Sequence, residues 1–103
     1  MSLCLFLISV IPKTPRLTVN PSNAVIESGT SVTLECVTES TGAVAAYTFL
    51  KDGQAVFSDT DGFHTVDSVS TAESGTYTCT VVMNSVTSLP SDGHSITVVG
   101  EGN

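Results

Sequence analysis

The chain has 103 residues, which is enough for one domain. Ten acidic and three basic residues give it a formal net charge of −7. Because nucleic acids and anionic membranes are bound through clustered Lys and Arg, this composition argues against both as partners.

The first eleven residues, MSLCLFLISVI, form an apolar run that is too short to span a bilayer. The run has the length of a signal-peptide core, but it lacks a preceding basic stretch and a small-residue cleavage site. Two interpretations remain, the end of a larger ectodomain or an extra edge strand. An exposed apolar strand aggregates unless it is paired, so we expect the run to pack on this domain or on a second copy, as a homodimer. Residues 1–14 are assigned to an N-terminal extension or linker, which Pro12 and Pro15 keep extended.

Short segments of alternating polarity follow, separated by turn residues and without a helical period, which predicts an all-β fold. Strands are expected at residues 16–20, 24–27, 30–38, 44–51, 55–58, 63–69, 75–84 and 94–99. The segment 30–38 alternates most clearly, with Val32, Leu34 and Cys36 on the core side. Residues 85–93 are expected to form a polar loop, and 100–103 a C-terminal tail.

Spacing on the segment 63–69 places His64 where a core residue usually stands, beside core positions at Val66 and Val69. Burial of an imidazole disfavours its charged form. An inward-facing His64 therefore predicts a domain whose stability changes between neutral and mildly acidic pH.

The segment Glu73-Ser74-Gly75-Thr76-Tyr77-Thr78-Cys79 carries the most specific pattern in the chain. Tyr77 and Cys79 point to the same face of a strand, and Gly75 allows a sharp entry into it. The pattern resembles the Asp-x-Gly-x-Tyr-x-Cys signature of immunoglobulin domains, with Glu73 in place of Asp. Together with the stretches 29–36 and 47–53, it resembles C2-type immunoglobulin domains over residues 15–99. The likeness extends more loosely to Fc-receptor-like proteins and the platelet–endothelial adhesion molecule.

This resemblance implies a Greek-key β-sandwich of about seven or eight strands with one disulfide between its sheets, Cys36–Cys79. It implies that Tyr77 bonds back to the preceding turn as a tyrosine corner. It also implies that Phe49 takes the place of the Trp usually packed against the bridge, in a core shared with Leu34. A disulfide implies an oxidising compartment, and hence an extracellular or cell-surface location in the secretory pathway.

Cys4 and Glu73 fit this framework less directly. Cys4 is left over, and is either buried in the first strand, exposed, or used between chains. No basic residue follows Asp52 to pair with Glu73 as in V-type domains, which favours the C2 type.

No arrangement typical of an enzyme is visible, and no catalytic residue, metal or cofactor is expected. His64 and His94 lack zinc-ligand spacing. Asp59-x-Asp61-Gly62 matches part of a calcium loop without its remaining ligands, which indicates a surface turn.

We therefore expect an extracellular domain of a cell-surface receptor or adhesion protein that acts in protein–protein recognition, with a protein ligand or a homophilic contact. The candidate contact residues are Thr48, Leu50, Val82 and Asn84 on one sheet face and Leu89 in the 85–93 loop. Two alternatives stay open: a structural spacer in a multi-domain ectodomain, and an intracellular muscle-type immunoglobulin domain with free thiols.

Overall fold

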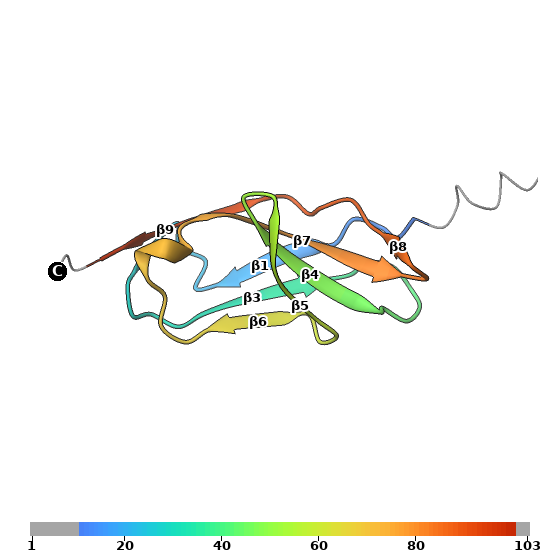
Figure 1. Cartoon of the computed structure of the whole chain (residues 1–103), viewed down its shortest axis with the longest axis horizontal. Helices are drawn as coiled ribbons and strands as arrows, with labels where there is room; N and C mark the ends of the chain where they lie inside the picture. The colour runs from blue at the N-terminus through green and yellow to red at the C-terminus, as the bar shows by residue number, and fades with distance from the viewer. Residues whose placement is uncertain (1–10, 101–103) are drawn as a thin grey trace, which may run out of the picture.

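Two β-sheets pack against each other in the computed structural model, which describes residues 11–100 (Figure 1). The small sheet has the antiparallel order β1 (Arg16–Asn20), β3 (Val32–Val37), β6 (Phe63–Val66). The large sheet has the order β2 (Val25–Glu27), β9 (His94–Val99), β7 (Gly75–Met83), β4 (Ala46–Lys51), β5 (Gln54–Asp59), and β8 (Val86–Thr87) also pairs with β7. The predicted all-β sandwich is confirmed. It has nine strands within residues 11–100, and β8 is the strand that was not expected.

The core follows from the alternation of side chains along the strands. Val32, Leu34 and Cys36 of β3 are buried, as predicted, and so are Ile96 and Val98 of β9. Side chains of both sheets therefore meet in one apolar layer.

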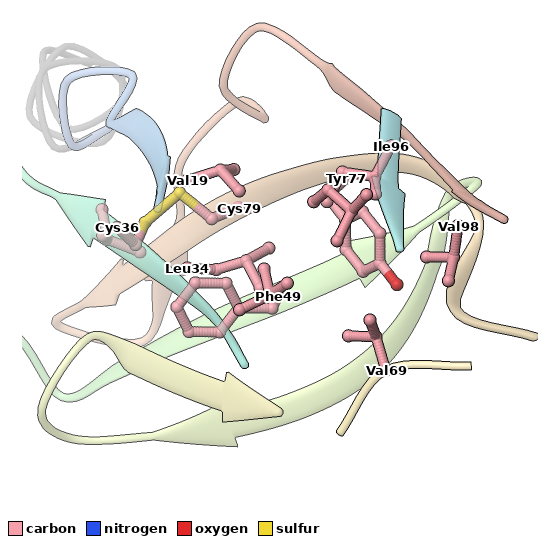
Figure 2. Packing of buried hydrophobic residues seen from close by; sticks show 12 residues of the cluster. Val19, Leu34, Cys36, Phe49, Val69, Tyr77, Cys79, Ile96 and Val98 are labelled. Carbon is pink, nitrogen blue, oxygen red and sulfur yellow. A yellow bond between two sulfur atoms is a disulfide. The ribbon is translucent and has the colours of Figure 1, made fainter. Parts of the chain in front are cut away.

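A disulfide joins Cys36 of the small sheet to Cys79 of the large sheet (Figure 2). Phe49 lies directly opposite Cys79 in the pairing of β4 with β7, and its side chain is fully buried near Leu34. The bridge and the ring thus occupy the centre of the sandwich, where the resemblance to immunoglobulin domains placed them.

Pro21 lies between the first two strands. β1 pairs with β3, whereas β2 pairs in parallel with β9 of the other sheet. Because proline has no N–H to donate, it ends one ladder, and the chain crosses to the other sheet within four residues of this point.

Several predicted strand limits differ from those of the structure. β4 begins at Ala46 rather than at residue 44, although Val44 still packs against the core. β6 ends at Val66 rather than at 69, because the backbone bends at residues 67 and 68. Val69 nevertheless reaches the core, held by backbone hydrogen bonds to Gly29 and Thr30.

The loop expected at residues 85–93 was also wrong in part, because it contains strand β8. Asn84 and Ser85 both have positive φ angles, 54° and 66°, and form a two-residue hairpin turn that pairs Met83 with Val86. Asn tolerates this left-handed conformation better than most residues. The hairpin adds β8 to the large sheet.

The turn before β7 is fixed by its own side chains. Ser70 caps the short helix η1 (Thr71–Glu73), and the Glu73 carboxylate accepts hydrogen bonds from the Ser70 N–H (2.6 Å) and hydroxyl (2.9 Å). These hydrogen bonds hold the pKa of the Glu73 carboxyl below its usual range. The Tyr77 hydroxyl donates to the Glu73 carbonyl at 2.6 Å, which is the bond of a tyrosine corner. Glu73 therefore needs no arginine partner.

Residues 1–10 and 101–103 lie outside the described residues. The predictions for Cys4, for pairing of the apolar run and for the end of the tail fall on them.

Candidate protein-binding face

The large sheet presents one broad surface to solvent, which we call the outer face. It consists of the side chains on β4, β7 and β9 that alternate with the core residues. These are Ala46, Thr48, Leu50, Thr76, Thr78, Thr80, Val82, Ser95, Thr97 and Val99.

No residue of the outer face carries a charge, although the chain as a whole carries −7. On the small sheet, by contrast, the same alternation turns Arg16 and Glu35 outward, and Arg16 lies 3.5 Å from the Glu39 carboxylate. The acidic residues of the described chain lie in turns, on the sheet edges and on the small sheet. The outer face is thus a neutral area on an acidic protein.

Several hydroxyl groups of this surface bond to each other across the strands. Thr48 Oγ1 lies 3.3 Å from Ser58 Oγ of β5, and Thr76 Oγ1 lies 2.9 Å from Ser95 Oγ. Part of the hydrogen-bonding capacity of these groups is therefore used within the sheet. Among the apolar residues of the outer face, Val99 is 42% exposed.

The structure brings three of the predicted contact residues together. Thr48 and Leu50 lie two residues apart on β4, and Val82 lies on the adjacent strand β7, opposite Ala46. All three are half-buried. Thr80, between them on β7, is only 8% exposed and contributes little surface.

The other two predicted contact residues lie beyond the sheet. Asn84 is exposed in the hairpin turn that follows β7, where its backbone conformation already gives it a structural role. Leu89 is 67% exposed, in the segment between β8 and β9. They extend the candidate area to one end of the large sheet.

Ser88 and Ser91 position Leu89, and neither was among the predicted contact residues. The Val81 N–H donates to the Ser88 hydroxyl and the Cys79 N–H to the Ser91 hydroxyl, each at 3.0 Å. The backbone N–H groups of the two serines donate back to the carbonyls of Val81 and Cys79. Both serines are buried. Hydrogen bonds at both of its ends therefore hold the segment 88–91 against β7.

The two histidines do not form a site. His64 stacks on Phe57 with ring centroids 4.3 Å apart and lies 5.9 Å from Phe49, on the core side of β6. Burial lowers the pKa of His64 below its ordinary value, opposed by the charge of Asp59. His94 lies on β9, opposite Tyr77.

The turn at residues 59–62 is a surface turn, as predicted. The Asp59 carboxylate accepts hydrogen bonds from the N–H groups of Asp61 and Gly62, at 3.2 and 3.0 Å. Among residues 11–100, no group of three or more His, Cys, Asp or Glu residues is placed to hold a metal ion. In the same range, no helix has the length and apolarity needed to cross a membrane.

Both the sequence and the fold of this chain are similar to those of known immunoglobulin domains. A family model described as "immunoglobulin domain" matches residues 14–98. The second Ig-C2 domain of human Fc-receptor like A superposes with a TM-score of 0.69 at 28% identity, covering 84% of this chain and 98% of that one. Murine CEACAM1b superposes with a TM-score of 0.70 at 20% identity over 86% of this chain, which spans only 46% of the CEACAM1b chain. No curated protein sequence gives a significant match.

Proposed function

Since the chain belongs to the immunoglobulin domain family, as a C2-type domain, we propose that it is a recognition domain of a cell-surface receptor or adhesion protein. In this proposal it binds a protein partner through the outer face. The domain lies in an extracellular compartment and catalyses no reaction. Its likeness to a domain of human Fc-receptor like A supports the receptor class. The disulfide between Cys36 and Cys79 supports an oxidising compartment.

The observation that carries the proposal is the absence of charge on the outer face. Burying a charge in an interface costs free energy unless the partner supplies an opposite charge in good geometry. Charged residues are accordingly depleted in the buried centre of protein interfaces. A neutral area bearing Thr48, Leu50 and Val82 is the part of this acidic domain that a partner covers at the lowest cost of dehydration.

The test compares two threonines that differ in the sheet they occupy. Thr48 on the large sheet and Thr33 on the small sheet are both half-buried and face outward. Each lies close to a hydroxyl group on the next strand, Ser58 at 3.3 Å and Thr65 at 3.2 Å. Thr48→Glu and Thr33→Glu therefore place the same charge in matched settings on opposite faces.

Fluorescent tetramers of the oxidised domain are applied to a panel of cell types. We expect staining of some cells, loss of that staining with Thr48→Glu, and its retention with Thr33→Glu. Circular dichroism verifies that both variants are folded. Staining of no cell type favours the spacer function, and equal loss in both variants contradicts recognition through the outer face.

A further inference from the structure

Strand β5 forms a free edge of the large sheet. It pairs with β4 on one side, and no strand within residues 11–100 pairs with its other side. In Figure 1, β5 runs from the turn after β4 down to the turn that leads into β6. A free edge presents unpaired N–H and C=O groups, which form a template for a further strand.

The other edges of the two sheets carry features that discourage pairing, whereas β5 carries few. β2 has three residues and β6 has four. β1 begins at Arg16 and is followed by Pro21. β5 has six residues, and none of the five before Asp59 is charged or a proline. Short length, charge, proline and bulges are the usual protections of an edge. Of these, β5 has a bulge at Val56 and a charge only at its last residue, Asp59.

The side chains of β5 are apolar and accessible at the centre of the strand. Val56 is 50% exposed and Phe57 is 36% exposed. The register of β5 against β4 shifts between Phe49 and Leu50, which leaves Val56 without a partner on β4. This bulge places a valine at the middle of the edge.

A groove of about 290 Å³ lies beside this edge. Val56, Val66 and Tyr77 give it apolar walls, while Lys51, His64 and Glu73 provide polar groups. A strand added to β5 would find room for one of its side chains here, next to the hydrogen bonds of its backbone.

We propose that β5 pairs in antiparallel orientation with β5 of a second copy of this chain. Antiparallel pairing of a strand with itself is self-complementary, because a twofold axis sets the donors of each strand against the acceptors of the other. This inference does not depend on the proposed partner of the outer face. The pairing would join two large sheets into one, with their neutral outer faces side by side.

Charge selects the register of this pairing. With the twofold axis at Val56, each Val56 meets its counterpart, Asp59 lies opposite Gly53, and Asp52 lies opposite Thr60. A slip of one residue in either direction sets Asp52 opposite Asp59 or Asp61. Like charges placed directly opposite each other destabilise a strand pair, and each copy already carries −7. The Val56-centred register avoids this repulsion.

The first experiment measures the oligomeric state of the oxidised full chain by sedimentation equilibrium. We expect a concentration-dependent dimer, and we expect Val56→Lys to raise its dissociation constant by about tenfold or more, because two lysines then face each other across the axis. Val25→Lys is the matched control, since Val25 is 57% exposed on the opposite edge strand of the same sheet, and it should leave the dimer unchanged. A chain that stays monomeric up to millimolar concentration, or a dimer that Val56→Lys does not weaken, overturns the proposal.

The second experiment tests the register, in a Cys4→Ser background. Val56→Cys should form an intermolecular disulfide under mild oxidation, identified by mass spectrometry of the linked peptides. Ser58→Cys should not, because Ser58 faces Gln54 of the other copy and lies about 13 Å from its own counterpart, at roughly 3.3 Å per residue along a strand. Equal cross-linking of the two variants, or none in Val56→Cys, contradicts the Val56-centred pairing.

Discussion

Removal of the Cys36–Cys79 disulfide is expected to lower the free energy of unfolding by about 4 kcal/mol. The bridge spans a sequence separation of 43 residues, and closing a loop of this size removes roughly that much conformational freedom from the unfolded chain at 25 °C. Small domains have only about 5–15 kcal/mol in total. The bridge therefore supplies a large part of the stability.

Two perturbations separate the effect of the loop from the effect of packing. Reduction of the wild-type chain with dithiothreitol opens the loop but keeps both sulfur atoms. The double substitution Cys36→Ala, Cys79→Ala also leaves a void beside Phe49, because both cysteines are buried. We expect the alanine variant to be the less stable of the two.

Urea unfolding provides the measurement. The chain has no Trp and two Tyr, so circular dichroism and tyrosine fluorescence report the transition. With a denaturant slope of about 2 kcal/mol per molar, a loss of about 4 kcal/mol moves the midpoint down by roughly 2 M. A loss below about 1 kcal/mol on reduction would refute the assignment of this stability to loop closure.

Three further predictions concern single side chains. Tyr77→Phe removes the hydroxyl that donates to the Glu73 carbonyl and should lower the free energy of unfolding by about 0.5–1.5 kcal/mol; an unchanged urea midpoint contradicts this. Ser88→Ala leaves the Val81 N–H without its acceptor in a buried position. It should lower the free energy of unfolding by about 1–3 kcal/mol and speed hydrogen exchange at that amide. Unaltered exchange would contradict the role of Ser88 in holding residues 88–91 on β7. Because the pKa of His64 is lower in the folded chain than in the unfolded chain, the unfolded chain binds more protons in mild acid, so stability should be complete above about pH 6.5 and fall below it. Melting temperatures from pH 7.5 to 5.5 should drop in the wild type and less in His64→Gln, and parallel curves for the two would exclude His64 as the cause.

The alternation of apolar residues was enough to predict the central strands. β3 has the core residues expected from sequence, because Leu34 lies in a regular segment with polar neighbours on both sides. The tyrosine corner was implied by the resemblance of the segment 73–79 to the immunoglobulin signature, and the Tyr77 hydroxyl makes the expected bond. These features depend on local patterns, which a single sequence records.

One missed feature lacks its usual local signal, and the others depend on contacts between segments that are distant in the sequence. The turn at Asn84 and Ser85 lacks the glycine that usually marks a two-residue hairpin, so β8 was not expected. Ser88 and Ser91 resemble ordinary loop serines until the backbone of β7 is placed beside them. The neutrality of the outer face also becomes apparent only when the register aligns β4, β7 and β9.

The most direct measurement of recognition through the outer face is a cross-saturation NMR experiment. It uses the deuterated, ¹⁵N-labelled domain with membranes from cells that bind the tetramer. The amide signals of Thr48, Thr78 and Thr97 should lose intensity on irradiation of the membrane protein protons, while those of Thr18, Thr33 and Thr65 on the small sheet should keep theirs. The opposite pattern, or equal loss on both sheets, would contradict a binding surface on the outer face.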